Sequence, residues 1–559
     1  MMMKKQTAWL PFLIPLGGLT ACQKEKPAEP NIILILADDM GYSDIGCFGS
    51  EINTPNLDRL AAEGLRMTQF YNAARSCPSR AALLTGLYPH QTGVGDMLQN
   101  DSLPGYDTHL NFHCVTIAEV LKEAGYSTFI CGKWHVGGDE PYWPTKRGFE
   151  KQYGGPNTTG HYFGLERTRK FVVEGKDSMP PGEWIKSGSI EYKLMKNEDG
   201  SQWYATDAYT NRAIHYIHEH KKTNPGKPFF LYLAYTCPHW PLHAFPEDIA
   251  WYKGKYLNGG WDSTRVRRYK KMTGLGIIDP SWPLSSRHET VPAWETLSDS
   301  EKVVWDHWMA VYAAMIDRMD QNIGKLRKCL EDNGYDKNTM IIFLSDNGGC
   351  HEAARRGDPK AEPGSPHSFG GYDYPWANVS NTPFRWFKHW VHEGGISTPF
   401  IAWYPGKIKA GTINSQMAHI TDIMPTLVEI AGATYPSEYK GNSIYPLPGK
   451  SLVPLLTGRK AVLRDTLCWE HEGNRAVRCG KWKLVSRYDY SSNEELPWEL
   501  YDMEKDRSEL HNLAEQHPEK VKEMEQIYFS WASSVGVYPH KKLQERRKEM
   551  QQAKRNNKK

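Results

Sequence analysis

The sequence predicts an α/β fold in which a large mixed or mostly parallel sheet is flanked by helices and followed by a smaller C-terminal α+β subdomain. Apolar runs of strand length alternate with helical patterns over residues 31–435, as in proteins whose parallel strands are connected by helices. After residue 458, "TLCWEHEGNRAVRCGKWKLVSRYD" alternates as antiparallel strands do, and "PEKVKEMEQIYFSWASSV" has a helical pattern. The length of 559 residues suits one large domain and one small one.

The elements of the large domain can be placed in chain order. Within residues 301–332, apolar side chains from Val304 to Leu330 recur every three or four positions, so this stripe is expected to be buried in the core, and Gly334 follows as a helix stop. Residues 135–205 and 240–300 are rich in Gly, Pro, Trp and charge, and long loops of this kind are usually functional insertions. The predicted buried strands are 32–37, 128–131, 229–234, 340–344 and 399–403, and the predicted helices include 56–63, 116–124 and 301–332.

The first 22 residues have the composition of an export signal. Lys4 and Lys5 precede an apolar stretch, residues 8–19, that is too short to span a bilayer. The following "LTAC" resembles the lipobox of bacterial lipoproteins, which implies cleavage before Cys22 and lipidation of that residue; a plain secretory signal is the alternative. We therefore expect an exported bacterial lipoprotein of the periplasm or outer membrane, with the lipid anchor as its only membrane contact.

Charge and cysteine content exclude other classes of protein. A net charge of +3 does not indicate a nucleic-acid partner. The basic tail holds nine Lys/Arg against two Glu and is expected to be a frayed, solvated helix. With Cys22 lipidated, nine of the ten cysteines remain, and their scattered positions without C-x-x-C spacing predict neither a disulfide framework nor a zinc site. The expected parts are a signal peptide at 1–22, a charged linker at 23–30, the large domain at 31–458, the subdomain at 459–540 and the tail at 541–559.

Polar side chains follow the predicted strands where these strands end. In open α/β sheets the ligand crevice lies beyond the carboxyl ends of the strands, so these side chains are expected to converge. Aspartates after strands are often only caps or turn formers, so the convergence is what matters. Several oxygen donors favour Ca²⁺ over Mg²⁺, and Asn347, in place of a histidine, argues against zinc. The residues at strand ends are Asp38, Asp39, Lys133, His135, His239, Asp346 and Asn347, and Lys388 precedes the last strand.

The stretch "RSCPSRAALLTG", residues 75–86, predicts the start of a helix with proline in its first turn. Backbone N–H groups at a helix N-terminus attract anions. Ser76 and Arg80 share a face if the helix extends back to Ser76. Together with a cation, Lys133 and Lys388, this helix start would trap a tetrahedral anion such as sulfate or phosphate.

These residues stand in motifs that resemble the type I, formylglycine-dependent sulfatases of the alkaline-phosphatase superfamily, and in particular their bacterial arylsulfatase-like members. The motifs cover most of the chain. The resemblance implies an alkaline-phosphatase-like sulfatase domain over residues 31–458 that hydrolyses sulfate esters. The motifs are "DDMGYSDIGCFG", "TPNLDRLAAEG", "GKWH", "PHWPLH", "SDNGG", "HEGGISTP", "DIMPTL" and the late "GKWKL".

The family signature is Cys or Ser, any residue, Pro, then Ser/Thr/Ala, any residue and commonly Arg. Pro78 and Arg80 place Ser76 at the first position, whereas Cys77 would misplace both of them. The resemblance therefore implies a serine-type sulfatase, in which a radical sulfatase-maturating enzyme converts Ser76 to 3-oxoalanine (formylglycine).

The resemblance also implies a role for each site residue. Arg80 and Lys133 would hold the hydrated aldehyde and the sulfate, and His135 would act as the base for sulfate release. His239 and Lys388 would lie on the leaving-group side, where one of them protonates the departing oxygen; the sequence does not decide which. The implied ligands of one calcium ion are Asp38, Asp39, Asp346, Asn347 and residue 76.

An exported sulfatase favours a sulfated carbohydrate as substrate. We expect exo action on a terminal sugar, because a narrow pocket is expected between the two insertions. Trp240, His161 and His351 are candidate substrate contacts, the tryptophan as a stacking surface for a sugar ring. Two alternatives stay open: a phosphatase or phosphodiesterase that keeps Ser76 unmodified, and a glycan-binding lipoprotein with an inactive site.

Overall fold

The computed structural model describes residues 29–556 except 159 and 460. Among these residues, no helix combines the length and the hydropathy that a membrane span requires. The predicted signal peptide, the lipidated Cys22 and most of the predicted linker lie outside the described residues.

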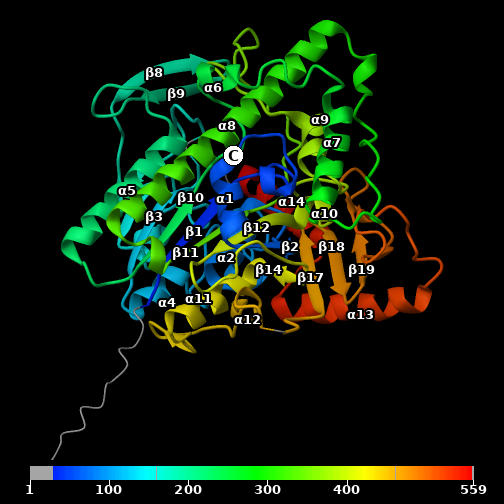
Figure 1. Cartoon of the computed structure of the whole chain (residues 1–559). Coiled ribbons are helices and arrows are strands. Elements are labelled where there is room, and N and C mark those ends of the chain that lie inside the picture. Colours follow the sequence, from blue (N-terminus) through cyan, green and yellow to red (C-terminus); the bar gives the residue numbers. More distant parts are fainter. Residues whose placement is uncertain (1–28, 159, 460, 557–559) are drawn as a thin grey trace, which may run out of the picture.

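An 11-stranded mixed sheet forms the centre of the molecule (Figure 1). β1 (Asn31–Ala37) lies within it, parallel to both of its neighbours, β10 (Phe229–Ala234) and β11 (Thr339–Ser345). β3 (Ser127–Gly132) pairs with β10 in the same direction. The carboxyl ends of these four strands therefore lie at one edge of the sheet, as the sequence predicted.

The sheet becomes antiparallel on one side of β11. β12 (Ser397–Trp403) runs against β11 and against β2 (Leu65–Tyr71). All five predicted strands are present, so the predicted mixed α/β class is confirmed. β2 was not predicted, because its polar residues Arg66 and Gln69 interrupt the apolar run.

Helices cover both faces of the sheet and create two hydrophobic cores. Alternate side chains of β1 enter the two cores, which explains why all seven of its residues are buried. The first core includes α1 (Pro55–Glu63), α5 (Ala205–Thr223) and α8 (Asp299–Asn333), and the second includes α2 (Ser76–Thr85), α4 (Ile117–Glu123) and α11 (Ile423–Ala431).

The long predicted helix is α8, and its ends follow from its sequence. The Ser298 side chain accepts a hydrogen bond from the Glu301 backbone N–H, while the Glu301 carboxylate accepts from the Ser298 N–H, which completes a capping box. Gly334 ends the helix with a φ of 72°, a conformation that glycine adopts without a Cβ clash. The expectation that Val304 belongs to the buried stripe was wrong: it is exposed, because the first turns of α8 extend beyond the core.

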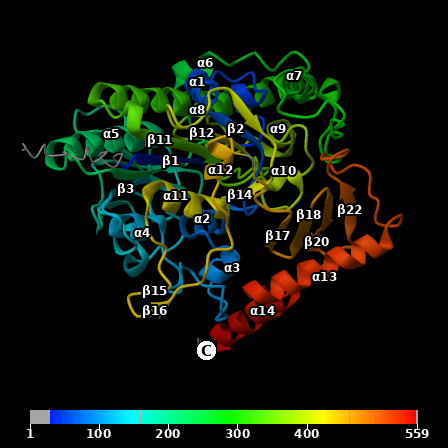
Figure 2. The same cartoon turned by 60° about the horizontal axis from the view of Figure 1, so that its bottom comes forward.

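The C-terminal subdomain is a four-stranded antiparallel sheet with a helix, as predicted (Figure 2). One face packs on α13 (Pro518–Val535), and the other packs on side chains of the large domain such as Tyr71 and Val391. The strands are β17 (Thr466–His471), β18 (Asn474–Cys479), β19 (Trp482–Ser486) and β22 (Glu499–Asp502).

A buried ion-pair network joins the subdomain to the large domain. The Glu393 carboxylate lies 3.0 Å from the Lys483 ammonium and 2.7 Å from Nε of Arg507. The same ammonium lies 2.7 Å from Glu509. All four side chains are fully buried, so we define them as the interface network.

Both predicted insertions contain regular structure. Residues 135–205 hold a three-stranded sheet of β5 (Gly164–Glu166), β9 (Ile190–Met195) and β8 (Gly182–Ser187). Residues 240–300 hold α6 (Pro246–Ala250) and α7 (Gly260–Gly274).

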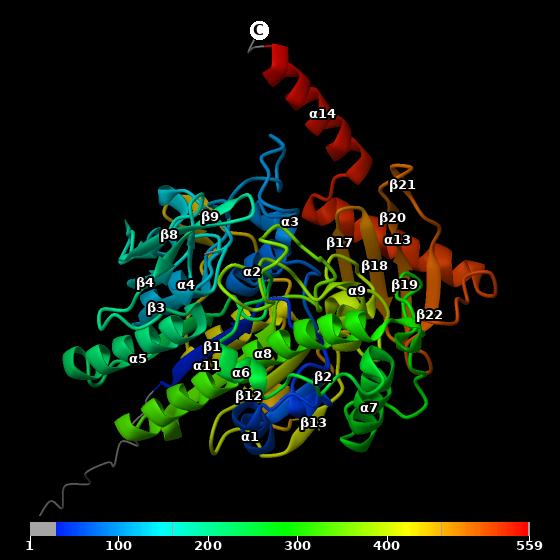
Figure 3. The same ribbon diagram turned by 90° about the horizontal axis from the view of Figure 1, so that it is seen from above.

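The basic tail forms α14 (His540–Asn556), which extends away from the body (Figure 3). The prediction of a fully solvated helix was wrong for its first half. Leu543 is buried, and Nη2 of Arg547 lies 2.5 Å from Asp96 and 2.7 Å from Asp101. These contacts hold the start of α14 against the large domain.

Candidate active site

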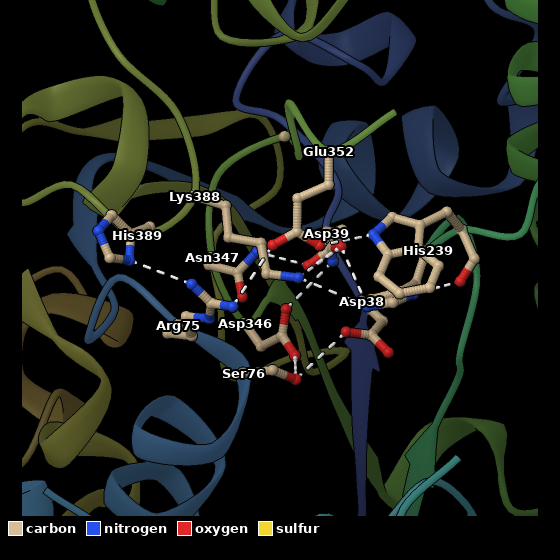
Figure 4. Close-up of polar contacts among 12 residues, drawn as sticks. Asp38, Asp39, Arg75, Ser76, His239, Asp346, Asn347, Glu352, Lys388 and His389 are labelled. Carbon is tan, nitrogen blue, oxygen red and sulfur yellow. Dashed lines mark hydrogen bonds and ion pairs between the residues drawn. The ribbon is translucent and has the colours of Figure 1, made fainter. Parts of the chain in front are cut away.

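The candidate site lies at the carboxyl edge of the sheet, where β1, β3, β10 and β11 end beside the N-terminus of α2. Figure 4 shows side chains that meet there, among them Asp38, Ser76 and Asp346. The structure brings together side chains that are up to 350 positions apart in the chain, because parallel strands deliver their ends to one place. The predicted residues found here are Asp38, Asp39, Ser76, Arg80, Lys133, His135, His239, Asp346, Asn347 and Lys388.

The Ser76 hydroxyl lies at the centre of the inner part of the site. It donates to Oδ2 of Asp346 at 2.6 Å and is 3.2 Å from Oδ1 of Asp38. Nε of Arg80 and Nζ of Lys133 both donate to it, each at 3.1 Å. Ser76 is 2% exposed, and two carboxylates and two cations lie within 3.2 Å of its buried hydroxyl.

Asp39 organises the outer part of the site. Its Oδ2 lies 2.9 Å from the Lys388 ammonium and 3.4 Å from Nε2 of His239. The Nδ1 of His239 lies 2.5 Å from the Trp240 carbonyl oxygen, which can only accept, so Nδ1 carries the proton and Nε2 faces Asp39 and Lys388. The Asn347 amide donates to Oδ1 of Asp39 at 2.8 Å.

The donor set fits a hard divalent cation such as Ca²⁺. Asp38, Asp39 and Asp346 supply carboxylate oxygens, and Asn347 supplies an amide oxygen. That amide oxygen, Oδ1, is buried and has no hydrogen-bond partner among the described residues. A buried acceptor without a partner is costly, and a cation would satisfy it.

The charges of the site shift the pKa values of its groups. Burial and the neighbouring Asp38 raise the pKa of Asp346 to about 7. Burial also opposes ionisation of Asp38, but Lys133, His239 and Arg80 outweigh it and hold the pKa of Asp38 well below its usual value. Burial, together with Lys133 and Arg80, lowers the pKa of His135 far below its usual value, so His135 is neutral and able to accept a proton.

Several non-glycine residues of the site have left-handed backbone conformations. The φ angle is 65° at Asp39, 63° at His135 and 93° at His389. Backbone hydrogen bonds hold two of them: the N–H of His135 donates to Pro156 and the N–H of His389 donates to Ala74. Such conformations cost energy and are concentrated at functional sites.

The three predicted substrate contacts have different outcomes. His161 is not at the rim: it is buried, and its two ring nitrogens contact the Pro366 carbonyl at 2.9 Å and the Phe163 N–H at 3.0 Å. His351 packs its ring on Trp390 at a centroid distance of 4.9 Å and is half-buried. Trp240 does lie beside the site, with its ring 4.8 Å from that of His239.

Sequence reasoning missed Arg75 and Glu352, which lie beside Lys388 and Asp39 (Figure 4). Arg75 Nη2 is 3.4 Å from Glu352 Oε1, and the Trp240 indole N–H donates to Glu352 Oε2 at 2.8 Å. Burial favours the neutral acid, but Lys388, Arg75 and His239 lower the pKa of Glu352 to about 2, so it is ionised. Their positions in the sequence could have indicated both residues, because Arg75 directly precedes Ser76 and Glu352 follows Asn347, just after the end of β11, by five positions.

The comparisons with known proteins agree with this geometry. The family model described as Sulfatase matches residues 30–433, and the model described as N-sulphoglucosamine sulphohydrolase, C-terminal, matches residues 383–528. An arylsulfatase of Klebsiella aerogenes is 36% identical over 81% of this chain and 96% of its own length. A mouse N-acetylgalactosamine-6-sulfatase is 29% identical over 85% of this chain and 76% of its own length. The solved structure of Ps i-CgsB in complex with a neocarrahexaose is 28% identical, with a TM-score of 0.63, and the match covers 92% of this chain and 95% of that one.

Proposed function

The chain belongs to the sulfatase family and is a sulfuric ester hydrolase, and on this premise we propose that it removes sulfate from a terminal sugar of a sulfated glycan, with an aldehyde made from Ser76 as its catalytic group. The observation that carries the proposal is the position of the Ser76 hydroxyl, which lies within 3.2 Å of two carboxylates and two cations at the start of α2. An unmodified serine would form a sulfate ester that needs its own hydrolysis. Hydrated formylglycine carries two hydroxyls on one carbon, one to attack sulfur and one whose deprotonation releases the sulfate.

Asp38, Asp39, Asp346 and Asn347 would hold a calcium ion, which when bound makes a nearby hydroxyl more acidic and neutralises charge on a sulfate oxygen. Arg80 and Lys133 donate to the position of residue 76 and would bind the sulfate oxygens next to it. Neutral His135 would take the proton during sulfate release.

His239 and Lys388 lie on the other side of Asp39, where the alcohol of the substrate would leave. Their nitrogen atoms Nε2 and Nζ are 3.4 Å apart and both face Asp39. Lys388 carries protons at Nζ, and His239 could deliver one from Nε2 when its ring is doubly protonated, so either residue could protonate the departing oxygen.

The group of Arg75, Glu352 and Trp240 supports a sugar substrate. An arginine and a carboxylate together provide donors and acceptors for sugar hydroxyls, and an indole ring provides a flat apolar surface. Relatives support the same substrate class by their names: one is an N-acetylgalactosamine-6-sulfatase, and one solved structure contains a neocarrahexaose. Arg75 directly precedes α2, Trp240 follows β10 and Glu352 follows β11. His161, in the first insertion, is not part of this group.

Mass spectrometry of protein from the native host tests the aldehyde directly. The peptide carrying residue 76 should be lighter than its sequence mass by two hydrogen atoms, and it should react with a hydrazide probe. Release of sulfate from a panel of sulfated mono- and oligosaccharides tests the substrate. Unmodified Ser76 combined with phosphate release from phosphate esters would contradict the proposal, and release only from the interior of long polymers would contradict exo action.

We also propose that the chain is exported and lipidated at Cys22, that a serine-type radical enzyme matures it, and that its domain boundaries are those set out from the sequence. Support comes from "LTAC" and from the serine at signature position 76. Labelling with a radioactive fatty acid in the native host, compared between the wild type and Cys22→Ala, tests the anchor. Label in both proteins, or in neither, would contradict it.

A further inference from the structure

The inference concerns a group of metal-binding side chains where the C-terminal subdomain meets the large domain. His389 directly follows Lys388 in the large domain, whereas His471 ends β17 and Glu472 begins the turn to β18. One ligand atom from each of His389, His471 and Glu472 lies within 4.8 Å of the other two. Both histidines are buried, and the Glu472 side chain is 20% exposed, which gives an ion access from solvent. We define these three residues as the histidine cluster.

His471 is fully buried, yet neither of its ring nitrogens has a hydrogen-bond partner among the described residues. A buried polar atom without a partner costs free energy, and other buried histidines of this protein bond to a carbonyl, as His243 does to Ser368 at 2.8 Å. The Nε2 of His471 lies 3.9 Å from Oε2 of Glu472, too far for a hydrogen bond. A metal ion between these two atoms would satisfy both of them.

The hydrogen bonds of His389 present the lone pair of its Nδ1 to the cluster. Nη1 of Arg75, which can only donate, lies 3.0 Å from this Nδ1, so the ring proton is on Nε2 (Figure 4). Nε2 contacts the Tyr490 hydroxyl at 2.7 Å, and this hydroxyl donates to the Glu472 carbonyl at 2.8 Å. Metal-binding histidines are usually held by such a bond at the other nitrogen. Nδ1 and Oε2 of Glu472 are then two acceptors only 2.9 Å apart, an arrangement that a shared cation would stabilise.

The donor set and the distances fit Zn²⁺. Two imidazole nitrogens and one carboxylate oxygen are a ligand set of zinc sites that keep a fourth position for water, whereas the oxygen donors beside Ser76 suit calcium. Tetrahedral zinc with bonds of about 2.0–2.1 Å separates its ligand atoms by about 3.4 Å. The distances of 2.9 Å and 3.9 Å from Oε2 of Glu472 lie on either side of this value, so small side-chain movements would complete the site.

The cations nearest the histidine cluster have carboxylate partners outside it. These pairs are Arg75–Glu352 at 3.4 Å, Lys388–Asp39 at 2.9 Å and Arg547–Asp96 at 2.5 Å. Asp96 also hydrogen-bonds to Glu472. Glu472 can therefore coordinate an ion without leaving a cation unpaired. When the ion takes the lone pair of His389 Nδ1, Arg75 gives up that contact and keeps Glu352.

We propose that His389, His471 and Glu472 bind a zinc ion that links the C-terminal subdomain to the loop of Lys388. The ion satisfies the two nitrogens and the carboxylate that face one another without a proton between them. Because His389 follows Lys388 directly, the ion also ties the β17–β18 turn to the loop that carries this lysine. The inference does not depend on the proposed substrate or on the aldehyde, since it concerns an ion bound by the folded chain.

The experiment uses the full chain without a histidine tag, freed of metal by a chelator and then saturated with Ca²⁺ so that the predicted calcium site is filled. Zinc is added, and the bound zinc is measured by mass spectrometry of the element after dialysis. We expect one zinc ion per chain and a rise in the thermal midpoint of about 2 °C at about 100 times the Kd. Hydrogen exchange over residues 386–392 and 468–474 should become slower when zinc is bound.

His471→Phe is the sharpest variant, because it keeps a buried ring, breaks no hydrogen bond of the described residues and removes both nitrogens. It should fold and lose the zinc together with the rise in the midpoint, and Glu472→Gln should weaken zinc binding at least about 10-fold. The matched control is His511→Gln, a 72% exposed histidine of the same subdomain, which should bind zinc as the wild type does. Asp38→Ala should also keep the zinc, which separates this site from the calcium site.

A wild type that binds no zinc, or that binds as much as His471→Phe, would overturn the inference. Zinc that is lost in His471→Phe but does not slow exchange over residues 386–392 would overturn the link to the loop of Lys388. Failure of the proposed function would be seen separately, as the absence of sulfate release from every ester in a protein that still binds zinc.

Discussion

Two buried clusters of charged side chains in this protein have similar compositions and opposite electrostatics. In the interface network, Lys483 and Arg507 outweigh the burial of Glu393 and lower its pKa to about 2. In the candidate site, burial and a second carboxylate raise the pKa of Asp346 to about 7, although Arg80 and Lys133 are close by. Both clusters pair carboxylates with cations, but the site also places carboxylates next to one another and leaves the Asn347 amide oxygen without a partner among the described residues. A charged cluster that binds a ligand can thus be distinguished from one that stabilises the fold, because the binding cluster leaves buried polar groups without partners.

The largest expected effect comes from removing the central hydroxyl of the site. Ser76→Ala should lower kcat/KM for a sulfated sugar by at least about 10⁴-fold, because no catalytic group can then form at residue 76. The thermal midpoint should change little, since the side chain is small. Residual activity near the wild-type level would show that residue 76 is not the catalytic group. Ser79→Ala, one turn away on α2, serves as the matched control for folding.

Calcium should stabilise the site and leave the interface network unaffected. At about 100 times its Kd, the ion should add roughly 2.7 kcal/mol to the free energy of unfolding. Thermal unfolding with and without calcium measures this, and the stabilisation should disappear in Asp38→Ala. An equal shift in wild type and variant would mean that calcium binds elsewhere.

His239→Ala and Lys388→Ala distinguish the proton donor from its neighbour. The variant that lacks the donor should lose about 10²- to 10⁴-fold in kcat on a sugar sulfate, whose alcohol is a poor leaving group. The same variant should lose far less on a nitrophenyl sulfate, which leaves without a proton. A variant that loses equally on both substrates has instead lost binding or positioning. If neither variant is rescued by the better leaving group, the assignment of these residues to the leaving side is wrong.

Breaking the interface network should affect stability instead of chemistry. Glu393→Gln leaves Arg507 and Lys483 short of a buried partner, and we expect a loss of about 3–5 kcal/mol in the free energy of unfolding, with activity retained per folded molecule. Urea unfolding measures the loss. Unchanged stability would mean that the network contributes no net energy.

The same network predicts a pH dependence of stability. The folded-state pKa of Glu393 is about 2, below its ordinary value of 4.5, so its contribution is complete above pH 4.5 and declines as the pH falls towards 2. The wild type should lose stability across this window faster than Glu393→Gln. Parallel curves for the two proteins would contradict the shifted pKa.

The smallest expected effect concerns α14. Arg547→Ala should release the start of this helix at a cost of about 1–3 kcal/mol, because the guanidinium contacts the buried side chains of Asp96 and Asp101. Hydrogen exchange over residues 540–548 measures the release. The matched control is Arg546→Ala, since Arg546 is 44% exposed and pairs with Glu549 of the same helix. Equal exchange in both variants would show that Arg547 does not hold α14.

The sequence predicted the sheet because its central strands are apolar on both faces, and a strand buried on both sides needs no tertiary context to be recognised. The same argument placed the seven residues at the strand ends, whereas the helix pattern placed Ser76 and Arg80 and the start of the last strand placed Lys388. The strand argument failed for β2, whose partly exposed positions carry polar residues, and for the strands of the first insertion, which include exposed residues.

The residues around the site were harder to predict for a different reason. His161 stands in a loop in sequence but is covered by other loops in space, and nothing in its neighbours along the chain shows this. Arg75, Glu352 and Glu472 meet only because the domain interface brings three unrelated segments together. Contacts between loops and between domains depend on tertiary packing, which the hydrophobic periodicity of the sequence does not indicate.

The direction of β1 has a practical consequence. The strand begins at Asn31, two residues after Glu29, and ends at Ala37, directly before Asp38, and its seven residues span about 23 Å. Any carrier, bead or surface linked to the chain ahead of residue 29 therefore attaches at the far end of this strand from Ser76. Immobilised by that route, the enzyme would present its reactive side to the surrounding liquid.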